Sequence, residues 1–182
     1  MKNIALHILD LAENSVRAQA LKVLISIIED PDNDSYRLVI QDDGCGMEEA
    51  VLHNATNPFF TSRSTRKVGL GLPLVQMNAE RTGGSFELHS EPGKGTTMEA
   101  DFIFSHPDRL PLGEIGEVLV LLAASLPQLR IVYEHKTPSG FYRFDTEAIR
   151  EITGNIQECN LEIRRFIEEM IMENLKEIKA ES

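Results

Sequence analysis

The chain has 182 residues, 42% of them hydrophobic, which is enough for one ordinary domain with a small extension. Its 18 Lys and Arg residues face 29 Asp and Glu residues, and the resulting net charge of -11 disfavours nucleic acid and anionic membranes as partners. The first residues lack the pattern of a secretory signal, no apolar run is long enough to cross a bilayer, and neither of the two cysteines belongs to a metal-binding or redox motif. We therefore expect a cytoplasmic protein with reduced thiols.

The chain up to about residue 104 has the hydrophobic patterns of helices alternating with pairs of strands. Apolar residues at mixed three- and four-residue spacing open the chain and indicate an amphipathic helix, whose polar face would carry His7, Asp10, Glu13, Asn14 and Arg17. The next two runs are β-rich, are separated by the turn signal PDND, and predict a hairpin. The expected elements in this part are a helix at 4–18, strands at 22–30 and 35–43, a long loop at 51–68, a helix at 69–82, and strands at 85–90 and 96–104.

This order of elements predicts an α+β fold, a two-layer sandwich in which the helices gather on one face of the sheet. The composition changes at residues 105–111, where SHPDRLP is typical of a linker. We therefore expect a domain at 1–105 and an extension at 106–182, built as helix, hairpin and helix. The sequence leaves open whether the extension adds to the first domain or forms a small docking module.

The first motif with chemical content is DLAENS at residues 10–15, on the opening helix. Asn14 offers an amide oxygen, a ligand type that suits Mg²⁺. Asp10 lies one turn earlier on the same face, where a carboxylate could orient or deprotonate a water molecule. The structural alternative is that both are solvated residues of a surface helix.

The second motif is DDGCGM at residues 42–47, where the second strand ends. Asp42 is placed to accept a hydrogen bond from an exocyclic amine, and the glycines let the backbone turn sharply beside a flat ring. Asp and Gly are also common in turns that merely end a strand, so this motif is weak by itself.

The third and fourth motifs are GLGLPL at residues 69–74 and GKGTT at residues 93–97. Closely spaced glycines before a helix present free N–H groups and the positive end of the helix dipole to a phosphate, and Arg63, Arg66 and Lys67 add positive charge. The spacing is neither a Walker P-loop nor a dinucleotide fingerprint. A solvated basic loop and an ordinary hairpin turn are the structural alternatives.

The four motifs in this order resemble the N, G1, G2 and G3 boxes of the GHKL ATPase superfamily, which includes gyrase, the large heat-shock chaperone, histidine kinases and MutL. The resemblance covers residues 4–104, and the stretch from PFFTSRSTRK to GKGTTMEADF is similar to the lid and G2 region of sensor histidine kinases. It implies the Bergerat fold with a mixed sheet, and binding of ATP with Mg²⁺. Asn14 would be the magnesium ligand, Asp42 the adenine-recognising carboxylate, Thr96 its neighbour, and residues 57–67 a mobile lid. The other residues that the resemblance assigns to the nucleotide pocket are Gly44, Gly46, Met47, Arg63, Lys67, Gly69, Leu70, Gly71 and Leu72.

Two departures from the kinase pattern bear on the fate of the bound ATP. Histidine kinases usually carry Asn where this chain has Asp10, while the MutL and gyrase branch carries a Glu that acts as the hydrolytic base. DLAENSVRAQA resembles the MutL form of this helix, so Asp10 is the candidate water-activating carboxylate. The G2 box also has Lys67 and Val68 where kinases have the first of three glycines.

The sequence therefore supports two functions. Only six residues precede His7, which leaves no room for a phosphoacceptor module in front of the ATPase domain, so a kinase of this kind would phosphorylate an unidentified partner protein in trans. The alternative is a slow ATPase whose lid closure changes the surface offered to a partner. A DNA-repair clamp is disfavoured by the acidic charge.

The extension ends in an apolar stripe with helical spacing, for which two interpretations stay open. Packing of this stripe against the body of the protein is the structural alternative, and homodimerisation or partner binding through the C-terminal helix is the functional one. The stripe consists of Ile163, Phe166, Ile167, Met170, Ile171 and Leu175.

Overall fold

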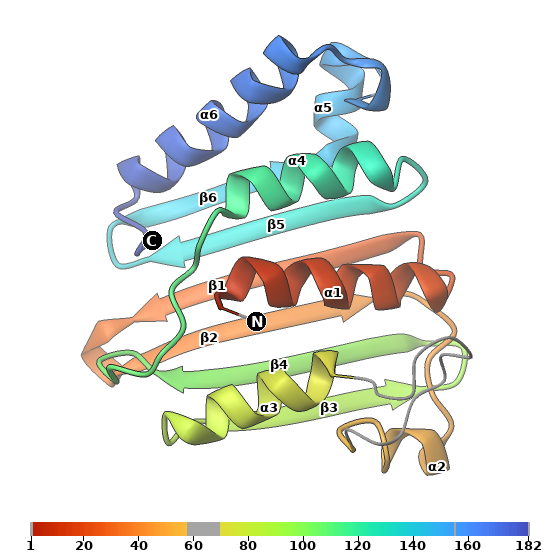
Figure 1. The fold of residues 1–182 in the computed structure, drawn as a ribbon, viewed down its shortest axis with the longest axis vertical. Helices are drawn as coiled ribbons and strands as arrows, with labels where there is room; N and C mark the ends of the chain where they lie inside the picture. The colour runs from red at the N-terminus through yellow and green to blue at the C-terminus, as the bar shows by residue number, and fades with distance from the viewer. Residues whose placement is uncertain (1, 58–69, 155, 182) are drawn as a thin grey trace.

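The computed structural model describes residues 2–57, 70–154 and 156–181, and one mixed sheet of six strands runs through it (Figure 1). The strand order is β3-β4-β2-β1-β5-β6. All neighbours pair antiparallel except β1 and β5, which are parallel. The elements are α1 (Ile4–Arg17), β1 (Lys22–Asp30), β2 (Ser35–Asp42), α2 (Glu49–Leu52), α3 (Gly71–Arg81), β3 (Ser85–Glu91), β4 (Gly95–Ile103), α4 (Ile115–Ser125), β5 (Arg130–Thr137), β6 (Gly140–Asp145), α5 (Thr146–Thr153), the 3₁₀ turn η2 (Ile156–Glu158) and α6 (Leu161–Glu177).

Helices α1, α3, α4 and α6 cover one face of the sheet, as Figure 1 shows. Alternate strand residues point into the core beneath them, and in β1 the inward positions are Val23, Ile25, Ile27 and Glu29. The predicted α+β architecture with helices on one face is therefore confirmed. None of the helices within the described ranges is both long and apolar enough to cross a bilayer.

Local signals fix where the helices begin. The Asn3 side chain accepts a hydrogen bond from the backbone N–H of Leu6 at 3.0 Å and caps α1. Asn160 caps α6 in the same way through the N–H of Ile163 at 2.9 Å. Both contacts satisfy N–H groups that have no partner within their own helix.

The C-terminal extension continues the sheet of the first part. Strand β5 pairs in parallel with β1 from Lys22↔Arg130 to Ile28↔Lys136, and β6 forms the outer edge. Helix α4 packs against α1 and α6, so the helical layer is continuous as well. The predicted helix, hairpin and helix are present and add to the first domain, while the domain boundary at residue 105 stays a prediction.

The structure differs from the sequence-based expectation at residues 49–57 and at His7. The short helix α2 and the turn after it occupy the start of the predicted loop at 51–68, and the part of that loop from residue 58 lies outside the described residues. His7 was assigned to the polar face of the first helix, and this is wrong because its side chain is only 1% exposed. It lies between α1 and α3, where Asn78 contacts it.

The apolar stripe of α6 is divided between the core and the surface. Ile167, Ile171 and Leu175 are buried against the body of the protein, as the structural alternative predicts. Ile163 and Phe166 are exposed. The same helix therefore both closes the fold and leaves apolar surface uncovered.

A buried polar cluster joins β1 and β5 at the end of the sheet near the C-terminus. His135 is fully buried, and its Nδ1 lies 2.6 Å from the Tyr133 hydroxyl while its Nε2 lies 2.8 Å from Glu29 Oε1. Glu29 also accepts the backbone N–H of Glu181 at 2.9 Å. The cluster thus ties the central strand to the last residues of the chain.

Replacing His135 by Ala is expected to lower the free energy of unfolding by about 3 to 5 kcal/mol, because it removes the side-chain partner of the buried Glu29 carboxylate and opens a cavity. Urea unfolding followed by circular dichroism measures this change. The matched control is the exposed neighbour, Lys136→Ala, which should shift the unfolding free energy by less than about 0.5 kcal/mol. Equal effects of the two substitutions would contradict the structural role of the cluster.

Candidate nucleotide-binding site

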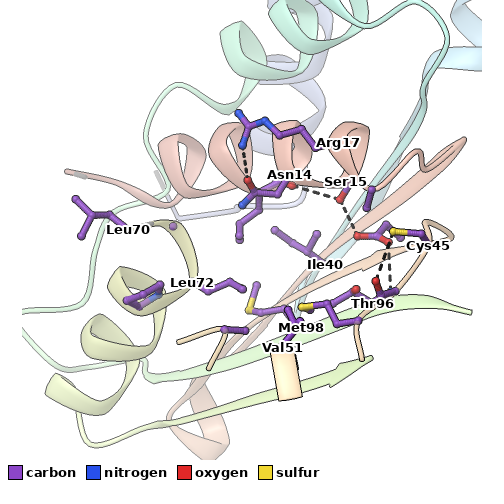
Figure 2. Close-up of a pocket in the computed structure, with 18 residues that line it drawn as sticks. Asn14, Ser15, Arg17, Ile40, Cys45, Val51, Leu70, Leu72, Thr96 and Met98 are labelled. Carbon is purple, nitrogen blue, oxygen red and sulfur yellow. Dashed lines mark hydrogen bonds between the residues drawn. The ribbon is translucent and has the colours of Figure 1, made fainter. Parts of the chain in front are cut away.

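A cavity of about 400 Å³ opens between α1, α2, the start of α3 and the strands β2 and β4 (Figure 2). This volume falls in the range of pockets that hold drug-sized ligands. Its walls combine apolar side chains with a few polar groups, the usual composition of a small-molecule site. The residues that line it are Leu11, Asn14, Ser15, Arg17, Ala18, Ile40, Asp42, Cys45, Gly46, Met47, Val51, Ala55, Leu70, Gly71, Leu72, Pro73, Thr96 and Met98.

Asp42 is held in place by three hydrogen bonds where β2 ends. Its Oδ1 accepts the backbone N–H groups of Gly44 at 3.0 Å and Thr96 at 3.2 Å, and its Oδ2 accepts the hydroxyl of Ser15 at 2.8 Å. A carboxylate offers about four acceptor positions, so Oδ2 can accept one more donor from a ligand. The bonded neighbours leave the side chain little freedom to rotate.

The loop after β2 is tied to the β3–β4 hairpin by the Ser90 hydroxyl. The backbone N–H of Met47 donates to Ser90 Oγ at 2.9 Å, and the Thr96 hydroxyl lies 2.9 Å from the same oxygen. Gly46 has φ +67°, and a Cβ at this position would lie 2.0 Å from the carbonyl oxygen of Glu91. Only glycine lets the loop pass this closely to the hairpin.

Apolar side chains from the neighbouring strands β2 and β4 form the floor of the cavity. Ile40 lies two residues before Asp42 on β2, and Met98 lies two residues after Thr96 on β4, so each points to the same face as its polar neighbour. Leu11 contributes from α1. This surface is suited to a flat, largely apolar ring beside the Asp42 carboxylate.

Asn14 lines the cavity from α1, and its Oδ1 accepts a hydrogen bond from Arg17 Nη1 at 2.9 Å (Figure 2). This oxygen is the atom predicted to bind Mg²⁺. The described residues contain no cluster of three or more His, Cys, Asp or Glu side chains that could hold a metal by themselves. A single amide oxygen fits a magnesium ion that takes its other ligands from phosphate groups and water.

Asp10 lies against the first residue of α3. An added Cβ on Gly71 would lie 2.3 Å from Asp10 Oδ2 and 3.5 Å from Asn14 Nδ2. Both side chains therefore point from α1 toward the N-terminus of α3, as their four-residue spacing predicts. Leu70, the residue before α3, makes no capping hydrogen bond with its side chain, and the N–H groups and dipole of a helix N-terminus favour an anion.

His7 lies one turn before Asp10, and its environment favours the neutral ring. Asn78 Nδ2 donates to His7 Nε2 at 3.1 Å, and the buried Nδ1 has no hydrogen-bond partner among the described residues. Burial lowers the pKa of His7 to about 4. The pair fixes α3 against α1 at the turn next to Asp10.

The depressed pKa of His7 predicts a loss of stability in mild acid. As the pH falls from about 6.5 to about 4, the unfolded chain takes up the proton first. His7 therefore contributes its full share to the free energy of unfolding above pH 6.5. This contribution falls by about 3 kcal/mol as the pH drops from about 6.5 to about 4. Urea unfolding at several pH values measures it, and His7→Leu should flatten the slope. An unchanged slope in this variant would contradict the assignment.

The cavity brings together most of the residues that the sequence assigned to a nucleotide site. Two predicted residues are not in the lining but contact residues that are. The backbone N–H of Gly44 donates a hydrogen bond to Asp42, and the Asp10 carboxylate lies against Gly71. The predicted residues in the lining are Asn14, Asp42, Gly46, Met47, Leu70, Gly71, Leu72 and Thr96. The predicted contacts outside the described residues are Arg63, Lys67 and Gly69, together with the lid from residue 58.

Several lining residues were not predicted. Ser15 could have been found as the neighbour of Asn14, and Ile40 and Met98 from the two-residue period of the strands. Arg17 falls on the same face of α1 as Asn14, three residues later. No sequence pattern marked Val51 or Ala55 as a pocket residue, because a loop was expected where the short helix α2 and the turn after it lie.

The comparison with protein families identifies the class of protein to which this fold and cavity belong. Residues 2–108 match the family described as histidine kinase-, DNA gyrase B-, and HSP90-like ATPases. The match covers more than half of the chain, which therefore belongs to this family. Membership implies that the chain binds ATP.

Similar curated proteins include sensor and sporulation kinases. The chain is 37% identical over 110 residues to the sensor protein kinase FleS of Pseudomonas aeruginosa, covering 60% of this chain and 27% of the relative. It is 30% identical over 94 residues to sporulation kinase A of Bacillus subtilis, covering 52% of this chain and 15% of the relative. The chain thus spans less than a third of the length of these relatives. It contains an ATPase domain similar to that of sensor histidine kinases.

A solved structure supports the fold alone. The N-terminal domain of a DNA repair protein superposes with a TM-score of 0.55 at 14% identity, covering 80% of this chain and 52% of that chain. The superposition extends beyond the matched family region. Part of the C-terminal extension therefore also has a structural counterpart.

Proposed function

We propose that this chain is an ATP-dependent protein kinase that transfers the terminal phosphoryl group of ATP to a separate protein. The observation that carries the proposal is the similarity of its ATP-binding region to sensor and sporulation kinases at 30% to 37% identity. The DNA repair domain is similar in fold alone, at 14% identity. The kinase branch of the family is therefore favoured over the repair branch.

The cavity suggests how its residues divide the work. Asp42 Oδ2 accepts a hydrogen bond from the exocyclic amine of adenine, while the side chains of Ile40 and Met98 exclude water from the adenine ring. The polyphosphate lies toward the N-terminus of α3, whose N–H groups and dipole favour negative charge. Asn14 would hold Mg²⁺, which would neutralise part of the charge of the phosphates. Asn14 Oδ1 accepts a hydrogen bond from Arg17, and this bond must break before the oxygen can bind the ion.

Two buried histidines bear on the choice of phosphoacceptor. His7 lies one turn from Asp10 but is buried, and its Nε2 is engaged by Asn78. His135 is buried in the cluster with Glu29. Neither of these two rings is available to accept a phosphoryl group, so they are not candidates for the phosphoacceptor, which the proposal places on another protein.

The second candidate is an ATP-driven conformational switch that hydrolyses ATP slowly. It is favoured by Asp10, whose carboxylate lies against Gly71 at the end of the site where the phosphates are expected. A carboxylate there could activate a water molecule. Such a protein would release free phosphate and change the surface offered to a partner.

The two functions are separated by following the label from ATP carrying a radioactive γ-phosphate. The purified chain is assayed alone and with cell extract, beside Asn14→Ala and Asp10→Asn. A kinase labels a discrete protein of the extract, and this label is lost in Asn14→Ala, with a rate reduction of at least about 100-fold. The labelled protein is then the substrate.

The same assay can contradict the proposal. If phosphate appears only in free form and Asp10→Asn abolishes its release, the chain is an ATPase switch. Binding of a fluorescent ATP analogue is measured in parallel. A variant that no longer binds the analogue has lost ATP binding, whereas one that binds normally has lost catalysis.

A further inference from the structure

Four polar side chains meet in the part of the cavity around Asp42, which we call the base end. Strand pairing sets Asp42 of β2 opposite Thr96 of β4, and Thr96 opposite Ser90 of β3. Figure 2 shows the hydrogen bonds that join Ser15 and Thr96 to the Asp42 carboxylate. Ser15, Asp42 and Thr96 line the cavity, whereas Ser90 does not. Ser90 can therefore act on a ligand only through its neighbours.

The Ser90 hydroxyl has a single hydrogen, and its contacts fix where that hydrogen goes. Ser90 Oγ lies 2.9 Å from the carbonyl oxygen of Gly95, which can only accept, so Ser90 donates there. The backbone N–H of Met47 donates to Ser90 Oγ at 2.9 Å. Thr96 Oγ1 is also 2.9 Å from Ser90 Oγ, and this contact is a hydrogen bond only if Thr96 is the donor. The hydrogen of the Thr96 hydroxyl therefore points to Ser90 rather than into the cavity.

The hydrogen of the Ser15 hydroxyl is committed in the same way. Ser15 Oγ lies 2.8 Å from Asp42 Oδ2 and 3.3 Å from the carbonyl oxygen of Leu11. A carboxylate and a carbonyl only accept, so the hydrogen goes to one of these two oxygens. With both hydroxyl hydrogens directed elsewhere, Ser15, Asp42 and Thr96 present lone pairs to a ligand. These three side chains thus accept hydrogen bonds from a ligand and do not donate them.

We propose that Ser90 is a positioning residue that makes the base end selective for nucleobases with an exocyclic amine, because it holds the Thr96 hydroxyl as an acceptor. An amine carries two hydrogens, of which one can reach Asp42 Oδ2 and the other the Thr96 oxygen, directly or through a water molecule. A keto oxygen in the same place would face only lone pairs, and acceptors left without a donor weaken binding. The inference rests on the proposed recognition of adenine by Asp42, and it holds for a kinase and for an ATPase alike.

The test compares the binding of ATP with that of inosine triphosphate, whose base carries a keto oxygen where adenine has its amine. Isothermal titration calorimetry with Mg²⁺ gives the two dissociation constants for the full chain, and their ratio is the readout. The wild-type chain should prefer ATP by at least about 100-fold. In Ser90→Ala the Thr96 hydroxyl is free to rotate and donate to the keto oxygen, so this preference should fall at least about 10-fold.

Two further variants separate positioning from a purely structural role. Ser90→Thr keeps the hydroxyl on a β-branched residue that suits a strand, and it should retain the wild-type preference within about three-fold. Ser85→Ala removes an exposed hydroxyl from the start of the same strand and should change neither dissociation constant more than about two-fold. A loosened β3–β4 hairpin would weaken the binding of both nucleotides together and leave their ratio unchanged.

Two outcomes would overturn the proposal, and they differ in what else they overturn. If the wild-type chain binds the two nucleotides equally, Asp42 does not select an amine, and the proposed recognition of adenine fails together with the role of Ser90. If the wild-type chain prefers ATP and Ser90→Ala keeps that preference, even with weaker binding of both nucleotides, the recognition of adenine stands and only the role of Ser90 is wrong.

Discussion

Asp42→Asn should reduce the affinity for ATP by roughly 100-fold or more while leaving the fold intact. Asparagine has the same shape and keeps an oxygen at Oδ1, so the bonds from Gly44 and Thr96 can persist. At Oδ2 an acceptor becomes an NH₂ donor, which would face the exocyclic amine of adenine. Two donors cannot share a hydrogen bond, and the lost bond to a charged acceptor is worth about 3 kcal/mol. Isothermal titration calorimetry measures the change.

The neighbouring residue provides a matched control for this prediction. Asp43 Oδ1 accepts the backbone N–H groups of Leu21 and Lys22, each at 2.8 Å, and lies outside the cavity lining. Asp43→Asn is the same chemical change and should alter ATP affinity less than about three-fold. The preference for ATP over GTP should fall only in Asp42→Asn. If both variants keep wild-type affinity, Asp42 does not recognise adenine.

The elements of the fold could be predicted because their signals are local. Alternating residues mark β1 and β2, the PDND turn separates them, and the observed pairing from Asp30↔Ser35 to Val23↔Asp42 matches the predicted hairpin. The strand order could not be predicted, because the parallel pairing of β1 with β5 joins segments that are distant in sequence.

The candidate site shows the same division between local and distant information. The motif residues Asn14, Asp42 and Thr96 were predicted as site residues from the order of the motifs, and they line one cavity. The bond from Ser15 to Asp42 was missed, since it depends on how α1 lies against β2. The burial of His7 was missed because helical periodicity gives the direction of a side chain but not the width of the face that neighbouring helices cover.

Gly71→Ala should disable the end of the cavity where the phosphates are expected. The added methyl group would lie 2.3 Å from Asp10 Oδ2, which no structure tolerates without movement. Either Asp10 rotates, which moves its carboxylate away from the end where the phosphates are expected, or the first turn of α3 moves from α1, which separates the N-terminus of α3 from Asn14. We expect the affinity for ATP to fall by about 10-fold and turnover by about 100-fold, because a displacement of about 1 Å from the reacting geometry has effects of this size.

A double substitution tests whether Asp10 is the cause of this loss. In the Asp10→Ala background the carboxylate that meets the new methyl group is absent, so adding Gly71→Ala should cost little further ATP affinity. The two changes should therefore be strongly non-additive, with a coupling free energy of about 1 kcal/mol or more, as expected for residues in contact. Additive losses of affinity would mean that Gly71 acts through the backbone of α3 alone. The coupling thus measures the contact by which the first helix, carrying Asp10 and Asn14, sets the position of the helix that faces the phosphates.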